Sequence, residues 1–283
     1  MVLEKDKSKK KVRLQSIYLL PNLFTTGCLF AGFYSIIMAI SGDFEKSAIA
    51  IFIAMILDSL DGRVARLTNS TSDFGENYDS LADIVSFGVA PAIVIYVWIL
   101  QDLGKLGWLA AFLYLAGAAL RLARFNSRKG KVDHRFFQGL PCPAAAALVA
   151  GIVWVITDLT ISGYYVISDK PLAWIAWAIV IYAGFCMISV LPYYSFKDFK
   201  LRKSVPFLML VMIALGLVLV SQDPPLIIFL VFIFYSLSGF FLYFYRRTKG
   251  LNPCIIDEEN IFETEFLDND KSSQSRKKSP KIF

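Results

Sequence analysis

Long apolar stretches alternate with short polar ones along most of the chain. Eight apolar stretches are each about as long as a helix needs to cross a bilayer, roughly 20 residues. We place them at about residues 17–40, 46–66, 80–100, 107–125, 143–166, 172–195, 205–221 and 225–245. The chain has 283 residues, of which 56% are hydrophobic, which is high for a soluble domain. The pattern therefore predicts an all-α integral membrane protein, a bundle of about eight transmembrane helices.

The polar segments divide this pattern into four parts. We expect a basic N-terminal segment (residues 1–15), a six-helix core (16–203), a two-helix transmembrane hairpin (204–249) and a tail (250–283). The apolar stretches of the hairpin contain no acid or base, which favours packing and lipid contact as their role. The tail contains an acidic run followed by a Ser- and Lys-rich sequence, and this composition predicts that it is flexible.

Positive charges gather in every second connection between the predicted spans. By the positive-inside rule, these connections and both termini lie in the cytoplasm. We expect the membrane to be the plasma membrane of a bacterium or an archaeon. The residues concerned are Arg63, Arg66, Arg121, Arg124, Arg128, Lys129, Lys131, Arg135, Lys197, Lys200, Arg202, Lys203, Arg246, Arg247 and Lys249.

Four carboxylates lie between the apolar parts of the second and third predicted spans. Asp58 and Asp61 are three residues apart, and Asp79 and Asp83 are four apart, so each pair shares one face of a helix. The text between the pairs is rich in turn formers, which predicts that one helix ends and another begins there. Carboxylates at membrane depth are costly and mark a functional site by default.

The acid cluster predicts a site for hard divalent cations. Four facing carboxylates cannot all stay ionised in a low-dielectric pocket without cations between them. The segment 58–83 contains no histidine or cysteine, and pure oxygen ligands suit Mg²⁺ or Mn²⁺ rather than zinc. A cation transporter is the alternative outside the enzymes. Transporters commonly show internal repeats, and none is visible here, so an enzyme is favoured.

The spacing of the acids matches a known pattern, D-x2-D-G-x2-A-R-x8-G-x3-D-x3-D. All eight fixed positions are present, as Asp58, Asp61, Gly62, Ala65, Arg66, Gly75, Asp79 and Asp83. This segment resembles the signature of the CDP-alcohol phosphotransferase family. The resemblance implies that the hydroxyl of a small alcohol attacks the lipid-side phosphate of a CDP-linked lipid, and that CMP leaves.

The resemblance also implies roles for individual residues. Two Mg²⁺ or Mn²⁺ ions would be held by Asp58, Asp61 and Asp79, with Asp83 partly in the same shell. Asp83 would be the general base; a role as ligand only is the alternative. Donor-binding residues would be Asn22, Thr25, Asp58, Gly62, Ala65, Arg66 and Gly75.

Simpler roles stay open for three of the donor-binding candidates. Pro21 is expected in the first turn of the first span, so Asn22 and Thr25 either reach the nucleotide or cap that helix. Arg66 either pairs with a phosphate or extends to the membrane interface.

Four further stretches resemble the phosphatidylserine synthase branch of this family. They are Pro21-Asn22, SFGVAPA (86–92), LRLARFN (120–126) and FFQGLPCPAAAA (136–147), and the similarity covers about residues 15–150. It implies CDP-diacylglycerol and L-serine as substrates, membrane lipids as surroundings, a homodimer, and no nucleic-acid partner. Sister enzymes that use glycerol 3-phosphate, inositol phosphate or choline are the alternative.

Two arginines are the candidates for binding the acceptor. An arginine fork holds a carboxylate through two hydrogen bonds, so Arg121 and Arg124 suit the carboxylate of serine. They suit the phosphates of the donor equally well, or serve only as positive-inside anchors. Asn126 either binds the amino group of the acceptor or caps its helix.

Overall fold

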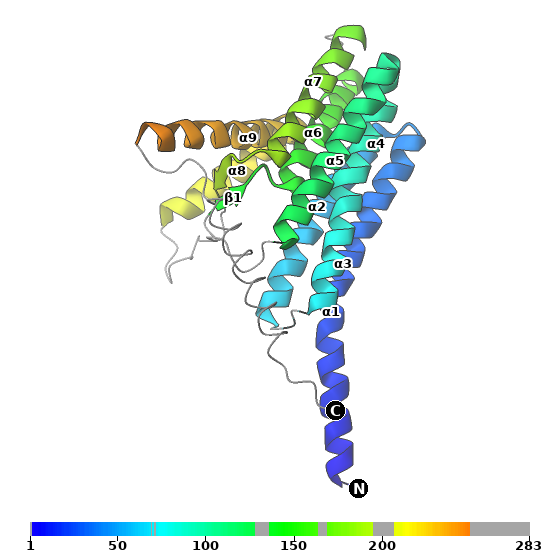
Figure 1. Cartoon of the computed structure of the whole chain (residues 1–283), viewed down its shortest axis with the longest axis vertical. Coiled ribbons are helices and arrows are strands. Elements are labelled where there is room, and N and C mark those ends of the chain that lie inside the picture. The colour runs from blue at the N-terminus through cyan, green and yellow to red at the C-terminus, as the bar shows by residue number, and fades with distance from the viewer. Residues whose placement is uncertain are drawn as a thin grey trace, which may run out of the picture.

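The computed structural model describes residues 2–68, 70, 72–127, 136–163, 169–194 and 207–249, and most of these are helical (Figure 1). The α-helices are α1 (Val2–Ile40), α2 (Phe44–Leu67), α3 (Asp73–Asp83), α4 (Ala90–Trp98), α5 (Lys105–Ser127), α6 (Cys142–Ile161), α7 (Asp169–Ile188), α8 (Phe207–Gln222) and α9 (Pro224–Thr248). A π-helical segment, η1 (Ile84–Val89), and a 3₁₀ segment, η2 (Leu100–Leu103), flank α4. The predicted all-α class is confirmed.

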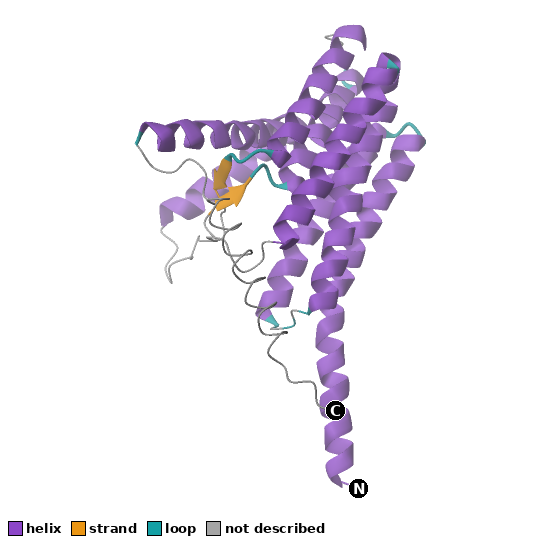
Figure 2. Cartoon of the chain, in the orientation of Figure 1, coloured by secondary structure: helices purple, strands orange, loops and turns teal. Residues whose placement is uncertain are grey.

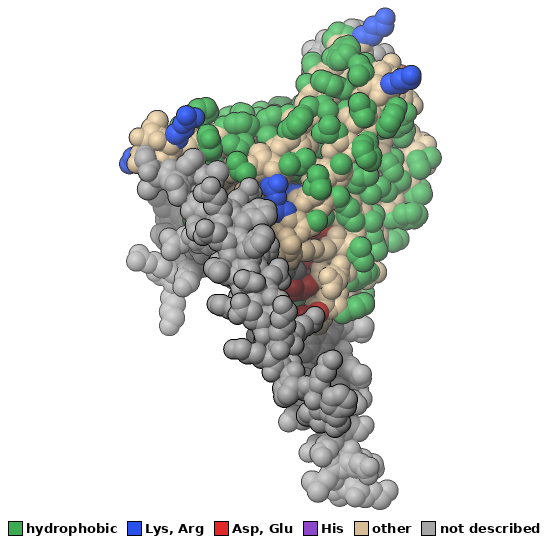
Figure 3. Space-filling model, in the orientation of Figure 1, with side chains coloured by type: hydrophobic (Ala, Val, Ile, Leu, Met, Phe, Trp, Pro, Cys, Tyr) green, Lys and Arg blue, Asp and Glu red, His purple; other side chains and the backbone are tan. Residues whose placement is uncertain are grey.

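Six helical segments among the described residues are long and apolar enough to cross a membrane. They are Pro21–Ile40, Asp73–Trp98, Lys105–Ser127, Cys142–Ile161, Lys170–Ile188 and Pro224–Thr248. Hydrophobic side chains accordingly cover the outer face of the bundle (Figure 3). The prediction of an integral membrane protein is confirmed; the described residues contain six such spans, and eight were expected for the whole chain.

The two remaining predicted spans differ for separate reasons. Helix α2 has 24 residues and lies against α1, but its second half carries Asp58, Asp61 and Arg63. Helix α8 has 16 described residues, about 24 Å, which is shorter than the hydrocarbon core of a bilayer; the predicted start of this span, at residues 205 and 206, lies outside the described residues. In Figure 1, α9 runs across the bundle instead of alongside it, so the predicted hairpin is not a simple extension of the bundle.

Helices α1 and α2 form an antiparallel pair that carries half of the acid cluster. Asp43 begins α2, because its carboxylate accepts hydrogen bonds from the backbone of Lys46 and, at 2.6 Å, from its ammonium group. These bonds lower the pKa of the Asp43 carboxyl. Farther along, the buried Ser35 and Ser47 each donate to the other's carbonyl oxygen at 2.8 Å. Two reciprocal bonds in an apolar environment fix the register of the pair.

The first helix differs from its prediction. Helix α1 already begins at Val2, so Pro21 lies inside it and does not open it. The basic segment 1–15 continues the same helix, and its N-terminal half projects beyond the bundle in Figure 1. A proline inside a helix removes one backbone hydrogen bond. The position of Pro21 coincides with the point at which α1 reaches the ends of α2 and α3.

The third span is interrupted by a π-helical segment directly after Asp83. Pro91 has no N–H, so the carbonyl of Phe87 loses its usual helical partner. The hydroxyl of the fully buried Tyr114 donates to this carbonyl at 2.9 Å and replaces it. The N–H of Ala90 bonds to the carbonyl of Val85, five residues back. Such segments occur often at functional sites.

Small residues let the inner helices approach closely. Helix α6 begins with the run CPAAAALVAG and is buried along most of its length. A Cβ atom on Gly117 of α5 would lie 2.9 Å from the carbonyl oxygen of Gly184 on α7. Tight backbone contact of this kind is how membrane helices gain packing energy.

A short strand pair joins the α5–α6 connection to the end of α7. Strands β1 (Phe136–Gln138) and β2 (Pro192–Tyr194) are antiparallel, with Phe137 opposite Tyr193 (Figure 2). Gly139 follows β1 with a φ of 77°, and its N–H donates to the carbonyl of Leu191 at 2.9 Å. A Cβ atom on Gly139 would lie 2.4 Å from the carbonyl oxygen of Met187. Only glycine fits there without strain.

Some sequence predictions fall outside the described residues. These are the tail at 250–283 and the basic groups at 128–135 and 197–203.

Candidate active site

The acid cluster forms where α2 ends and α3 begins. Asp58 and Asp61 lie on α2, and Asp79 lies on α3. Carboxylate oxygens of these three residues lie within 4.8 Å of one another. The turn between the helices closes because Ser72 caps α3, its side chain accepting from the N–H of Gly75 at 3.0 Å. The predicted helix–turn–helix arrangement of the acids is confirmed.

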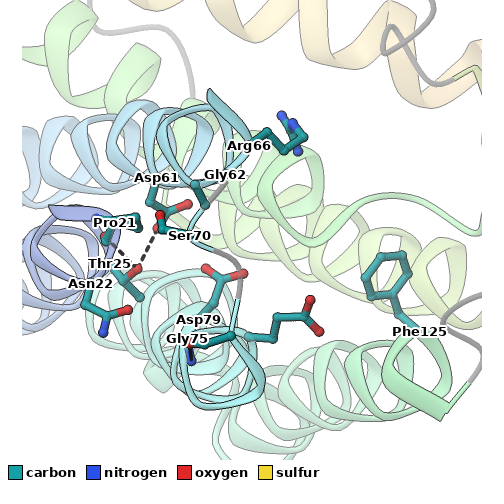
Figure 4. Close-up of a pocket in the computed structure, with 13 residues that line it drawn as sticks. Pro21, Asn22, Thr25, Asp61, Gly62, Arg66, Ser70, Gly75, Asp79 and Phe125 are labelled. Carbon is teal, nitrogen blue, oxygen red and sulfur yellow. Dashed lines mark hydrogen bonds between the residues drawn. The ribbon is translucent and has the colours of Figure 1, made fainter. Parts of the chain in front are cut away.

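A cavity of about 260 Å³ opens beside these carboxylates (Figure 4). It is lined by Pro21, Asn22, Thr25, Asp61, Gly62, Ala65, Arg66, Ser70, Ser72, Gly75, Glu76, Asp79 and Phe125. Figure 4 shows Asp61 and Asp79 facing the same space from opposite walls, with Asn22 and Gly75 beside them. In Figure 3, acidic side chains show in a recess near the end of the bundle from which α1 projects.

Helix α1 holds one acid in place. The hydroxyl of Thr25 lies 2.9 Å from the Asp61 carboxylate and 3.2 Å from the carbonyl oxygen of Pro21. Both Thr25 and Asp61 are buried. A buried carboxylate that accepts a hydrogen bond keeps one orientation, so Asp61 is preorganised toward the cavity.

The two glycines of the pattern border the cavity in different ways. A Cβ atom on Gly75 would lie 3.3 Å from the side-chain oxygen of Asn22 and 3.2 Å from that of Ser72. A Cβ atom on Gly62 would meet only the end of the Arg66 side chain, at 3.7 Å. The absence of a side chain at Gly62 therefore leaves space in the cavity itself.

Asp83 is the fourth acid; it ends α3, four residues after Asp79, and is not among the residues that line the cavity. Its Oδ1 atom is buried and has no hydrogen-bond partner among the described residues. Carboxylates gathered as closely as those of Asp58, Asp61 and Asp79 need protons or cations among them. The oxygen-only donor set, together with this orphaned oxygen, fits a hard divalent cation such as Mg²⁺ or Mn²⁺.

Comparison with known proteins identifies the family. The model of the CDP-alcohol phosphatidyltransferase family matches residues 18–182, which include the whole acid cluster and its cavity. The chain belongs to this family. The family resemblance predicted from the acid pattern is thereby confirmed.

Several relatives have names that refer to serine or to a serine lipid. A protein named CDP-diacylglycerol–serine O-phosphatidyltransferase from Helicobacter pylori is 37% identical over 217 residues, 77% of this chain and 88% of that protein. A protein of the same name from Mycobacterium leprae is 43% identical over 155 residues, covering 53% of this chain and 50% of its own length. An archaetidylserine synthase from Methanothermobacter thermautotrophicus is 36% identical, covering 64% of this chain and 72% of its own length.

The structure gathers most of the residues expected to bind the donor. Six of the seven candidates line the cavity: Asn22, Thr25, Gly62, Ala65, Arg66 and Gly75. Asp58, the seventh, lies behind it in the acid cluster. Arg66 is exposed at the rim.

The three expected acceptor residues lie elsewhere. Arg121 donates to the sulfur of Cys142 at 3.5 Å, and its Nε is buried without a partner in the part of the chain that is described. Arg124 donates to the carbonyl of Ile188, in the last turn of α7, at 2.9 Å. Asn126 donates to the hydroxyl of Ser80 at 2.9 Å and lines a separate groove between α3 and α5. The three side chains therefore do not converge on one point.

Four cavity residues were not anticipated. Ser70, Ser72, Glu76 and Phe125 all line the cavity. Ser70 and Ser72 belong to the turn that the sequence did predict, and Ser72 has the spacing of a helix cap. Phe125 comes from α5; it belongs to the stretch LRLARFN that resembles the family, but nothing in the stretch singled it out as a cavity residue.

Proposed function

We propose that the protein transfers the phosphatidyl group of CDP-diacylglycerol to the hydroxyl of L-serine, forming phosphatidylserine and CMP. One observation carries the proposal: three carboxylates offer oxygens within 4.8 Å of one another beside a polar cavity at the end of a membrane bundle. The names of the relatives supply the acceptor.

The cavity suits the nucleotide end of the donor. Asn22, Ser70 and Ser72 offer polar groups, and Gly62 leaves room for close approach to the backbone. Arg66 at the rim supplies a cation for a phosphate. The lipid chains of a donor held here would remain in the membrane, because the cavity lies at the end of membrane-spanning helices.

Asp58, Asp61 and Asp79 would hold the divalent cations, two of which are expected, with Asp83 adjoining them. When bound, such ions neutralise the charge that develops on the departing phosphate. Thr25 keeps Asp61 in position through its hydrogen bond.

Asp83 would take the proton from the serine hydroxyl as the new P–O bond forms. The bond between the two phosphates of the donor breaks, and CMP leaves with its electron pair. The Oδ1 atom of Asp83 is buried and has no hydrogen-bond partner in the described part of the chain, which supports this role because its lone pairs are available to a hydroxyl.

Arg121 is the better of the two arginine candidates for the serine carboxylate. Its Nε is buried and unpartnered among the described residues, and such a donor is costly unless a ligand satisfies it. Arg124 already caps a carbonyl of α7.

Three further features belong to the proposal. Clustered positive charge in alternate connections supports a cytoplasmic site and cytoplasmic termini. A homodimer and two bound ions, Mg²⁺ or Mn²⁺, are expected from the family resemblance.

The test is CMP release from CDP-diacylglycerol by the purified protein with Mg²⁺ or Mn²⁺. L-serine, glycerol 3-phosphate, inositol phosphate and choline are supplied one at a time. We expect release with serine, and we expect Asp83→Asn to abolish it. Asp102→Asn, the same change on η2 away from the cluster, is the control and should retain activity. Release with another alcohol but not serine refutes the proposed acceptor, and no release with any alcohol refutes the proposed activity.

A further inference from the structure

Helix α9 lies beyond the residues that the family model matches, yet it contacts the part of the bundle nearest the arginine pair. The model match ends at residue 182, and α9 spans Pro224–Thr248. Helix α9 packs against α6 and against β2. In Figure 1, α9 crosses the bundle near the strand pair.

The contact between α9 and β2 centres on one buried tyrosine. Tyr193 is fully buried, and its hydroxyl donates to the carbonyl oxygen of Ser236 at 3.1 Å. Its ring centroid lies 5.7 Å from that of Tyr235. A Cβ atom on Gly239 would lie 2.4 to 2.9 Å from three atoms of the Tyr193 ring. The ring therefore occupies the space that a side chain at Gly239 would need.

Next to the strand pair, the segment between β1 and α6 is bonded to the end of α7. The N–H of Gly139 donates to the carbonyl of Leu191, and that of Leu140 donates to the carbonyl of Cys186, both at 2.9 Å. The last carbonyls of a helix have no partner within it. Arg124 satisfies another of them, at Ile188.

Arg121 lies in the same assembly. Its guanidinium donates to the sulfur of Cys142 in the first turn of α6, and α6 packs against α9. The Tyr235 hydroxyl on α9 donates to the carbonyl of Tyr194 at 3.3 Å. Both arginines thus contact helix ends next to the strand pair, Arg121 at the start of α6 and Arg124 at the end of α7.

We propose that α9 is a positioning element for the acceptor alcohol: through Tyr193 and Tyr235 it holds the strand pair and, at the adjoining start of α6, Arg121 in the geometry that binds the acceptor. This inference rests on the proposed function, because it assigns Arg121 to the acceptor. Tyr193, Tyr235 and Gly239 are positioning residues, since none of them lines the donor cavity.

The test uses Gly239→Ala, Tyr193→Leu and the double variant, in the full-length protein. Gly239→Ala forces the Tyr193 ring away from α9. We expect the KM for serine to rise about tenfold, while kcat and the KM for CDP-diacylglycerol change less than about twofold. In the double variant, Gly239→Ala should change the KM for serine little beyond the effect of Tyr193→Leu alone, because the ring that the alanine displaces is already gone.

Gly216→Ala is the matched control in the neighbouring helix α8. A Cβ atom there meets nothing within 4 Å, so the KM for serine should stay unchanged.

Hydrogen exchange at the amides of Gly139 and Leu140 supplies a readout that does not require activity. Exchange at both should be faster in Gly239→Ala than in Gly216→Ala.

Two results would overturn the inference. One is a fall in kcat together with an equal rise in the KM for both substrates, which indicates a general defect of folding. The other is unchanged exchange at Gly139 and Leu140, which shows that α9 does not hold the strand pair. If another alcohol replaces serine as the acceptor, the proposed function fails, and the KM for that alcohol tests the positioning role in the same way.

Discussion

Replacing Gly32 by alanine probes the contact that places Asp83. Gly32 lies on α1, directly against Ser86 of η1, three residues after Asp83. The Ser86 hydroxyl donates to the carbonyl oxygen of Cys28 on α1 at 3.0 Å. This bond and the missing side chain at Gly32 bring the two backbones together.

The size of the effect follows from the geometry. A Cβ atom on Gly32 would lie 2.4 Å from the Ser86 hydroxyl oxygen and 2.7 Å from its Cα atom. Carbon atoms prefer about 3.5 to 4.0 Å, so the helices must separate by roughly 1 Å. Rotating the Ser86 side chain cannot relieve a clash with Cα. Overpacking of this kind costs about 1–3 kcal/mol, and a shift of about 1 Å at a catalytic group costs up to about 100-fold in rate.

The assay compares Gly32→Ala with Gly27→Ala in detergent. A Cβ atom on Gly27 of the same helix would lie 3.3 Å from the end of the Leu57 side chain, which has room to move. We expect the melting temperature to fall by about 2–12 °C in Gly32→Ala and by much less in the control. CMP release should fall with it. A Gly32→Ala protein that melts and turns over like the wild type would show that the contact does not position Asp83.

Three further predictions concern the Tyr114 hydroxyl, the Thr25–Asp61 hydrogen bond and the divalent cations. Tyr114→Phe leaves the carbonyl of Phe87 without its donor in the π-helical segment, and should cost about 1–3 kcal/mol in thermal unfolding; Tyr34→Phe, at a partly exposed side chain, is the control. Thr25→Val removes the hydrogen bond to Asp61 and should weaken Mn²⁺ binding by about 10- to 100-fold in a direct titration; unchanged binding would contradict the role of Thr25. Removal of divalent cations with EDTA should abolish CMP release and lower the melting temperature, and adding cation at about 100 times its Kd should restore about 2.7 kcal/mol of stability. Activity that survives EDTA would exclude a bound cation as a requirement.

The sequence by itself determined the class of the protein and the position of its acids. Apolar stretches of membrane length leave few alternatives to helices, because every backbone polar group must be satisfied inside the bilayer. The i, i+3 and i, i+4 spacings of the aspartates fix which acids share a helix face, and the serines and glycine between them predict the turn. These features are local, so the pattern along the chain is enough to predict them.

Only the tertiary structure decided where the flanking elements lie. The π-helical segment depends on Pro91 and on a hydroxyl from Tyr114, which is distant in the sequence. Helix α1 continues past Pro21, and its position there is set by packing against α2 and α3.

The arginine pair shows the same limit. Their spacing in the sequence places Arg121 and Arg124 on one helix face. In the structure, Arg121 donates to Cys142 on α6 and Arg124 donates to Ile188 on α7. Helix α9 is apolar up to its last turn and has the length of an ordinary span, but in the folded chain it crosses the bundle and packs against α6 and β2. Contacts between residues that are far apart in the sequence leave no periodic signal along it, so they become visible only when the chain is folded.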